Sequence, residues 1–286
     1  KNKVDSEHLL VQLEGAGYEI VPETEDITEV GADILIINTC GFINDAKEES
    51  IQAILEGVQA KEEGHISELL VFGCLSQRYK SELMEEIPQV DRYFGAYDLD
   101  SMLKYLGVKK DSELLTRRLL TTPKHYAYLK ISEGCDRQCS YCAIPGIRGP
   151  HVSVPMEELL REAQFLASIG VKELILIAQD TTRYGEDLYG VYSLDSLIHE
   201  ISLIEGIEWI RVLYCYPEEI DDNLIASIKR NNKVCHYIDM PIQHCSDTIL
   251  KAMGRKTDLN SLNNIINKLR SEIPDIAIRT TLIAGF

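Results

Sequence analysis

The chain has 286 residues, of which 45% are hydrophobic, enough for about two domains with buried cores. It has no apolar run of about 18 residues and no signal-peptide pattern, so we expect no membrane span. The formal net charge of -17 argues against a large nucleic-acid surface; it fits a basic protein partner or simply keeps the chain in solution. Eight cysteines without a secreted context indicate a reducing cytoplasm rather than a disulfide scaffold.

The first hundred residues alternate helical and extended patterns. Apolar spacing and short β-branched runs predict four elements in chain order: a helix over 6–14, a strand over 32–38, a helix capped by Asn44 or Asp45 with Ile51, Ile54, Leu55 and Val58 on one face, and a strand over 69–73. Both strands are apolar enough to be buried parallel strands. We therefore assign residues 1–106 to an open α/β domain, flavodoxin-like or Rossmann-like.

Residues 107–124, which are rich in charge and threonine, are predicted to form a linker. A second α/β series follows. Its predicted strands are 126–131, 172–178, 209–214, 236–240 and 277–283, and its predicted helices are 156–169, 194–204, 220–229 and 259–271. Strands that alternate with helices form parallel sheets with right-handed crossovers. We therefore expect residues 125–286 to form an open or partial (β/α) barrel that stops after its fifth strand.

Three closely spaced cysteines carry the strongest chemical signal. Cys135, Cys139 and Cys142 stand in the run Glu-Gly-Cys-Asp-Arg-Gln-Cys-Ser-Tyr-Cys, after the predicted strand 126–131. Three thiolates on one loop can hold three corners of a 4Fe–4S cluster and leave its fourth iron open to a small molecule. The alternative is a zinc site, but zinc usually takes four protein ligands. Because no second cysteine pair is near and Tyr141 is unusual in a zinc knuckle, the pattern favours the cluster.

Other polar residues also follow predicted strands. Cys40 and Cys74 come after the two strands of the first domain, and Gln179, Asp180 and Gln243 follow strands of the second. Ligands bind at the carboxyl ends of parallel strands, in open sheets and in barrels alike. These residues are therefore candidate site residues. A lone cysteine at such a position is often only a small buried residue, and ordinary loop packing explains the other three about as well.

The remaining reactive residues have no such pattern. Cys215, Cys235 and Cys245 lack partner spacing, so we expect them to pack in the core or at the surface. His244 lies at a predicted strand end, and a structural role is the simpler interpretation. Arg148, in the run Pro-Gly-Ile-Arg-Gly after the triplet, could face a substrate or only the solvent.

The Cys-x-x-x-Cys-x-x-Cys run, with the aromatic Tyr141 before its last cysteine, resembles the radical S-adenosylmethionine superfamily. The resemblance implies a partial (β/α)6 barrel. It also implies that a 4Fe–4S cluster at the triplet binds S-adenosylmethionine and cleaves it with one electron to a 5′-deoxyadenosyl radical.

The runs Asn-Thr-Cys-Gly-Phe-Ile at 38–43 and Gly-Cys-Leu-Ser-Gln-Arg at 73–78 narrow the resemblance to the methylthiotransferases, over essentially the whole chain. Those enzymes hold a second, auxiliary 4Fe–4S cluster on three cysteines, of which Cys40 and Cys74 match two. The family's first cysteine precedes a Lys-Asn pair, so we expect it two residues before Lys1. We also expect the family's C-terminal TRAM domain to lie outside this chain.

Three further runs, at 40–50, 178–185 and 214–218, resemble the branch that methylthiolates an aspartate β-carbon of small-subunit ribosomal protein S-twelve. This implies that ribosomal protein as substrate, an electron donor and a sulfur donor as partners, and a cytoplasmic location. Binding to a membrane or to nucleic acid is not expected for this chain. The alternatives are a transfer-RNA adenosine methylthiotransferase, whose motifs are absent, and a non-catalytic iron–sulfur or zinc module.

The resemblance also assigns roles to residues. It makes Cys135, Cys139 and Cys142 the ligands of the reducing cluster, and Cys40 and Cys74 ligands of the auxiliary cluster. Candidate contacts to S-adenosylmethionine are Tyr141, Gln179, Asp180, Gln243 and Arg279, the last of which could pair with a carboxylate of cofactor or substrate.

Overall fold

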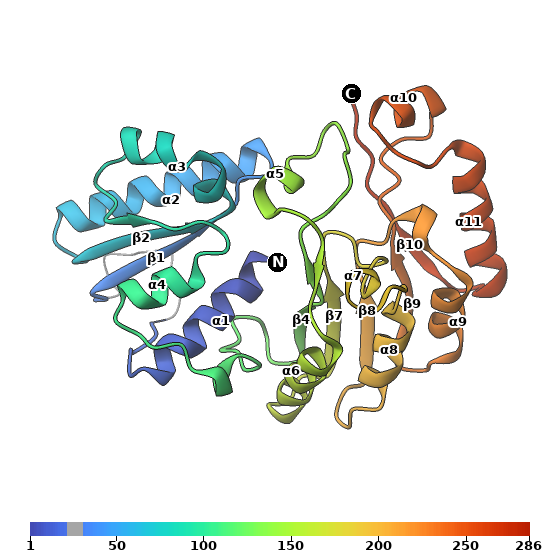
Figure 1. The fold of residues 1–286 in the computed structure, drawn as a ribbon, viewed down its shortest axis with the longest axis horizontal. Helices are drawn as coiled ribbons and strands as arrows, with labels where there is room; N and C mark the ends of the chain where they lie inside the picture. The colour runs from blue at the N-terminus through green and yellow to red at the C-terminus, as the bar shows by residue number, and fades with distance from the viewer. Residues whose placement is uncertain (22–30) are drawn as a thin grey trace. The chain divides into compact units, whose positions relative to one another are not determined.

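The computed structural model describes residues 1–21 and 31–286, which divide into two compact units (Figure 1). The N-terminal unit comprises Asn2–Leu119 together with Gly146–Arg148, and the C-terminal unit comprises Lys1, Leu120–Pro145 and Gly149–Phe286. The sequence-based limits of the two domains, at residues 106 and 125, stay predictions. Within the described ranges, no helix combines the length and the apolar character that a membrane span requires.

A small parallel sheet forms the centre of the N-terminal unit. Its strands, in spatial order, are β1 (Ile34–Thr39), β2 (Glu68–Gly73) and β3 (Arg92–Tyr93). Side chains of a strand point alternately to the two faces of its sheet. On β2, Leu69 and Val71 enter one hydrophobic cluster while Leu70 and Phe72 enter another. Both faces of the sheet are therefore covered, which explains the uninterrupted apolar run of this strand.

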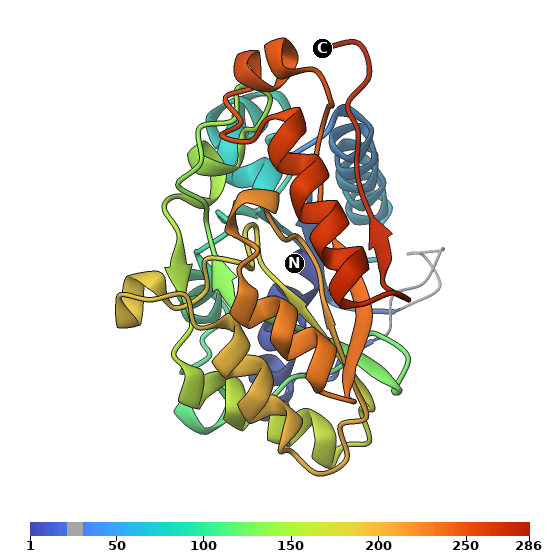
Figure 2. The ribbon, with the colours of Figure 1, turned by 90° about the vertical axis from the view of Figure 1, so that its right-hand side faces the viewer.

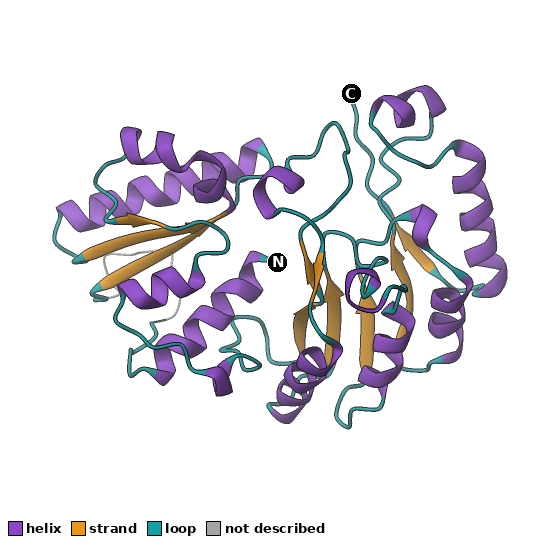
Figure 3. Cartoon of the chain, in the orientation of Figure 1, coloured by secondary structure: helices purple, strands orange, loops and turns teal. Residues whose placement is uncertain are grey.

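Helices cover both faces of this sheet (Figure 3). They are α1 (Asn2–Gly15), α2 (Asn44–Glu62), α3 (Cys74–Glu86) and α4 (Leu99–Tyr105). Ile54 of α2 and Leu83 of α3 share the cluster of Leu69, whereas Leu9 of α1 and Met102 of α4 share the cluster of Leu70. The unit is thus a three-layer α/β sandwich.

The details of α2 differ from the prediction. Asn44 is its first helical residue, Ile43 occupies the cap position in an extended conformation, and no side chain caps the helix. Ile51 and Leu55, predicted on the buried face, are 37% and 47% exposed. The small Ser50 and Gly57 are buried beside Ile54 and Val58 instead, so small residues and not only large apolar ones mark the packed face.

Five parallel strands form the sheet of the C-terminal unit. In spatial order they are β4 (Tyr126–Lys130), β7 (Glu173–Ile177), β8 (Trp209–Val212), β9 (Val234–Asp239) and β10 (Ala277–Arg279). Each is hydrogen-bonded to its neighbour in parallel register. Every predicted strand of this region is present, and the strands neighbour one another in chain order. This is the topology of a partial (β/α) barrel.

Helices α6 (Met156–Ser168), α8 (Leu194–Ser202), α9 (Asp222–Arg230) and α11 (Leu259–Glu272) lie side by side on one face of this sheet (Figure 2). Beneath them, alternate strand residues such as Leu129, Leu174 and Ile210 join the helices in one core. Tyr128 and Arg211 occupy the alternate positions, which point to the other face. The helix-covered face therefore forms the hydrophobic core of the unit. Candidate site residues are expected at the carboxyl ends of the strands.

Candidate functional site

The cysteine triplet lies on the loop that follows β4. The short strands β5 (Ser132–Glu133) and β6 (Val152–Ser153) pair antiparallel across the base of this loop, and α5 (Ile144–Arg148) lies within it. Cys135 and Cys139 are buried, and Cys142 is half-buried. The Cys142 N–H donates to the Cys139 carbonyl at 3.0 Å. A tight turn thus holds the last two cysteines close along the chain.

Glycine and backbone contacts close the base of the loop. The Cys135 N–H donates to the Gly149 carbonyl at 3.0 Å, on the returning segment. Gly134 has a φ of +75°, and a Cβ there would lie 1.9 Å from the Pro150 carbonyl oxygen. Only glycine combines this left-handed conformation with so close an approach. The sequence Gly-Cys is therefore a requirement of the loop geometry.

The thiols of the triplet influence one another. Burial raises the pKa of Cys135 and, with a contribution from Cys139, that of Cys142. Three thiols on one loop without a fourth match the donor set of an open-site iron–sulfur cluster, so the residues fit that group by their chemistry. In the part of the chain that the structure describes, no three or more Cys, His, Asp or Glu side chains are gathered as in a formed metal site.

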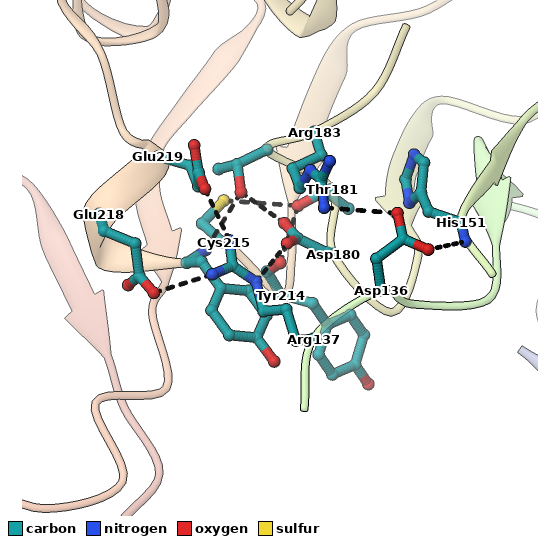
Figure 4. A network of polar contacts seen from close by, with 12 residues as sticks. Asp136, Arg137, His151, Asp180, Thr181, Arg183, Tyr214, Cys215, Glu218 and Glu219 are labelled. Carbon is teal, nitrogen blue, oxygen red and sulfur yellow. Dashed lines mark hydrogen bonds and ion pairs between the residues drawn. The ribbon is translucent and has the colours of Figure 1, made fainter. Parts of the chain in front are cut away.

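Arg137 connects the triplet loop to the ends of two other strands (Figure 4). Its guanidinium donates to Asp180 at 2.8 Å, to Glu218 at 2.8 Å and to Glu219 at 3.1 Å. It also lies 3.7 Å from the centre of the Tyr216 ring. Asp180 follows β7, and the other three residues follow β8. Arg137, which lies between the first two cysteines, is therefore held by residues at both strand ends.

This ion-pair network is almost dry. The side chain of Arg137 is 9% exposed and that of Asp180 is 1% exposed. Burial alone would lower the pKa of Arg137, but Asp180 and Glu218 raise it above its ordinary value, so the guanidinium stays charged. A charge-assisted contact of this kind is stronger than a neutral hydrogen bond. Arg137 was not selected from the sequence, because a lone arginine in a loop carries no pattern.

The two predicted residues after β7 are engaged by other side chains. The Asp180 carboxylate accepts from Arg137 and, at 2.5 Å, from the Thr182 hydroxyl. The Gln179 amide donates to the Glu133 carboxylate, which also pairs with Lys130 at 2.9 Å. Both residues therefore follow β7 and contact the segment that carries the triplet, Asp180 through Arg137 and Gln179 through Glu133. Their assignment to S-adenosylmethionine stays a prediction.

Gln243 and Tyr214 mark a strained part of the same edge. They follow β9 and β8, with φ of 68° and 62°, and are the two non-glycine residues of the described chain with positive φ. The Gln243 backbone bonds to Thr281 and Ile283, across to the segment after β10. Such conformations cluster at ligand and active sites. This observation adds weight to Gln243 as a candidate without assigning its side chain a ligand.

Arg279 and Tyr141 also have partners. Arg279, in β10, pairs at 2.8 Å with Asp239, whose side chain is fully buried, and Asp239 raises the pKa of Arg279. Burial, aided by Cys139, raises the pKa of Tyr141. The carboxylate partner of Arg279 in this structure is Asp239 of the protein itself, and the expected pairing with a carboxylate of cofactor or substrate stays a prediction. Whether either residue contacts a cofactor stays a prediction.

Three residues set aside in the sequence have simple environments. Cys215 is fully buried and contacts the Thr181 hydroxyl at 3.6 Å, and burial raises its pKa to about 12. Cys245 is exposed. The His244 ring accepts from the Ser246 N–H at 2.9 Å, which is a local turn contact.

Cys40 and Cys74 lie next to each other at one edge of the N-terminal sheet. Thr39 and Gly73 are register partners at the ends of β1 and β2, and the two cysteines follow them directly. A Cβ on Gly41 would lie 2.9 Å from the Cys74 backbone, so this glycine lets the two turns touch. The predicted position at the carboxyl ends of parallel strands is confirmed; the ligand role stays a prediction.

Arg148 completes this edge. It is 3% exposed, and its Nε donates to the Cys74 sulfur at 3.3 Å. The expectation that Arg148 faces the solvent was wrong, because Asp5 and Asn2 bind its buried guanidinium inside the N-terminal unit. The other alternative, a contact to substrate, stays a prediction. The sequence could not indicate these partners, because Asn2, Asp5 and Cys74 are all far from Arg148 along the chain.

Comparisons with known families match both parts of the chain. Residues 1–95 match the family described as Uncharacterized protein family UPF0004. Residues 129–286 match the Radical SAM superfamily. The two matched segments contain Cys40 and Cys74 in the first and the triplet in the second.

Curated relatives are similar over the whole chain. The protein named ribosomal protein uS12 methylthiotransferase RimO from Lachnoclostridium phytofermentans is 52% identical over 100% of this chain and 67% of its own length. Proteins of the same name from Bacteroides fragilis and Flavobacterium johnsoniae are 52% and 51% identical, each over 100% of this chain and 65% of the relative. The chain thus spans about two thirds of the length of these relatives.

Solved structures share the fold at low sequence identity. The radical S-adenosylmethionine methyltransferase TsrM from Kitasatospora setae has a TM-score of 0.71 with 12% identity, over 99% of this chain and 66% of its own. The cobalamin-dependent S-adenosylmethionine radical enzyme OxsB has a TM-score of 0.60 with 15% identity, over 88% and 41%. The match to the Radical SAM model and the 52% identity over the whole chain show the family. The chain belongs to the radical SAM superfamily and, within it, to the methylthiotransferase family of the RimO proteins.

Proposed function

We propose that this chain is the cysteine-bearing part of an enzyme that adds a methylthio group to an aspartate β-carbon of ribosomal protein uS12. The observation that carries the proposal is the identity of about half of all residues, over the whole chain, to proteins named for that reaction. The cysteine placement supports it, because the triplet and the Cys40–Cys74 pair each follow parallel strands.

An unactivated C–H bond explains why such a reaction needs these cysteines. No side-chain acid or base acting near neutral pH can remove hydrogen from an unactivated carbon. Cys135, Cys139 and Cys142 would hold a 4Fe–4S cluster, which together with S-adenosylmethionine would supply a carbon radical that can. Cys40 and Cys74, with a third cysteine from outside this chain, would hold an auxiliary cluster that handles sulfur.

The chain's own residues hold and shield the triplet. Arg137 fixes the loop through Asp180 and the two glutamates after β8. Gln179, Gln243 and Arg279 lie at strand ends in the same unit, where the amino and carboxylate groups of S-adenosylmethionine would need polar partners. An electron donor and a sulfur donor would act as partners of the complete protein.

The test uses a protein that carries this chain together with the segments by which its relatives are longer. After anaerobic reconstitution with iron and sulfide, S-adenosylmethionine and dithionite should yield 5′-deoxyadenosine. Cys139→Ala should abolish that product, and Cys245→Ala, at an exposed cysteine, is the matched control. Cleavage that survives Cys139→Ala would refute the assignment of the triplet.

The substrate is tested separately. Mass spectrometry of uS12 peptides should show one methylthio group in place of one hydrogen, on aspartate, with the active enzyme only. Modified transfer-RNA adenosine with unmodified uS12 would move the protein to the transfer-RNA branch. Zinc without iron, and no cleavage of S-adenosylmethionine, would indicate a non-catalytic module.

A further inference from the structure

Arg148 makes an unusual set of contacts beside Cys74. Its Nε lies 3.3 Å from the Cys74 sulfur and its Nη2 lies 2.7 Å from the Asn2 side-chain oxygen. Both terminal nitrogens lie 3.2 Å from one oxygen of Asp5. The side chain is 2% exposed. One guanidinium therefore orients a sulfur, an amide and a carboxylate at the same time.

The main chain of Arg148 is fixed as well. The Tyr97 hydroxyl donates to the Arg148 carbonyl oxygen, and the guanidinium carbon lies 5.8 Å from the centre of the Tyr97 ring. Gly146–Arg148 belongs to the N-terminal unit by its contacts, although Cys142 precedes it by only a few residues. Arg148 is therefore held from both ends, and its contact with sulfur does not depend on a freely rotating side chain.

The positive charge of Arg148 determines which state of the Cys74 sulfur this contact stabilises. A buried arginine loses hydration that must be replaced by anions and acceptors, and a fork of N–H groups suits acceptors in fixed directions. Asp5 replaces part of that hydration. A neutral thiol is a weak acceptor, whereas a thiolate ligand of a cluster is an anionic one. The Cys74 sulfur also lies 3.6 Å from the Asn2 side-chain oxygen, to which a thiol donates. The N–H contact from Arg148 is therefore the one that a metal-bound Cys74 would keep and strengthen.

We propose that Arg148 is a positioning residue of the auxiliary cluster: its N–H bond to the Cys74 sulfur, and its charge, raise the reduction potential of that cluster. The proposal rests on the proposed function, because it requires Cys74 to be a cluster ligand. Hydrogen bonds to cluster sulfurs and nearby charge set the potentials of iron–sulfur proteins. Reduction adds an electron, and a fixed cation stabilises the more negative state.

The test isolates the auxiliary cluster. The protein with the segments present in its relatives is prepared as a parent in which Cys135, Cys139 and Cys142 are all replaced by Ala. After reconstitution, iron and sulfide content are measured, and the reduction potential is followed by electron paramagnetic resonance. Arg148→Gln and Arg148→Lys are compared with Arg78→Gln. Arg78 is an exposed arginine of the same edge that donates to the Gly41 carbonyl at 3.4 Å and not to sulfur.

The expected result is a cluster in the parent and in all three variants, with a lower potential in Arg148→Gln, a smaller decrease in Arg148→Lys, and no change in Arg78→Gln. An unchanged potential in Arg148→Gln, or an equal decrease in Arg78→Gln, would overturn the proposal. Loss of cluster loading in both Arg148 variants would also overturn it, since the role would then be structural. A parent that binds no cluster would refute the auxiliary site in the proposed function itself.

Discussion

Replacement of Arg137 by Gln should destabilise the C-terminal unit strongly. Removing one partner of a buried ion pair costs about 3–5 kcal/mol, because the other charge is left buried without compensation. The Asp180 side chain is 1% exposed and cannot be rehydrated, whereas Glu218 and Glu219 are 15% and 18% exposed and can turn to water. We therefore expect the lower end of the range, about 3 kcal/mol.

The single tryptophan of the sequence, Trp209, reports on this unit because it opens β8. Urea unfolding followed by its fluorescence gives the free energy of unfolding. Arg183→Gln is the matched control: it removes a surface arginine that pairs with exposed carboxylates, and should cost less than about 1 kcal/mol. Adding Asp180→Asn to Arg137→Gln should recover part of the loss. Equal, small effects of the two arginine replacements would refute the reasoning.

Gly41→Ala places a Cβ 2.9 Å from the backbone of the first residue of α3, so auxiliary iron content should fall; Gly146→Ala, whose Cβ would meet no atom within 4 Å, should leave it unchanged. Cys215 should resist iodoacetamide at pH 8 in the folded protein, because its pKa is raised to about 12 by burial; rapid alkylation would contradict its placement. Burial acts to raise the pKa of Asp91, but a backbone N–H and the Lys61 ammonium outweigh it and lower the pKa below 3.8. Its stabilisation is therefore present above that value and lost as pH falls through the folded pKa. Asp91→Asn should cost about 1–2 kcal/mol at pH 7 and progressively less as pH falls from 3.8 through the folded pKa, as measured by urea unfolding with circular dichroism; a cost that does not fall with pH would contradict the sign.

Apolar period and strand-end position were enough to predict the C-terminal sheet. All five of its strands were found, because the strand positions that face the helices are apolar, as at the alternate residues Ala127 and Leu129 of β4. The same signal missed β3, which has two residues, and α3, where Leu75 and Leu83 lie among polar residues. β3 is too short to show a period, and α3, although 13 residues long, buries only two large apolar side chains, Leu75 and Leu83. Their place is decided by the neighbours that they pack against.

The candidate site divides in the same way. The cysteine triplet could be recognised from the sequence, because its spacing alone indicates that the three thiols can bind one cluster. The contacts of Arg137 and Arg148 could not be predicted, because the partners of each lie 43 or more residues away along the chain. Long-range ion pairs of this kind leave no local pattern. Position after a strand selected Gln243 as a contact to S-adenosylmethionine, which stays a prediction. Its positive φ, which the sequence did not indicate, follows from bonds to the segment after β10.

Three contacts that fix the triplet loop do not involve its sulfur atoms. Gly134 packs on Pro150, Arg137 pairs with Asp180, and the Ser140 N–H donates to the Met253 carbonyl at 3.0 Å. These backbone and ion-pair contacts hold the loop and leave the sulfur atoms of its cysteines to act as ligands. The Cys74 edge differs, because one of its fixed contacts, from Arg148, is made to the sulfur itself. Loss of iron should consequently change the local environment of Cys74 more than the fold of the triplet loop.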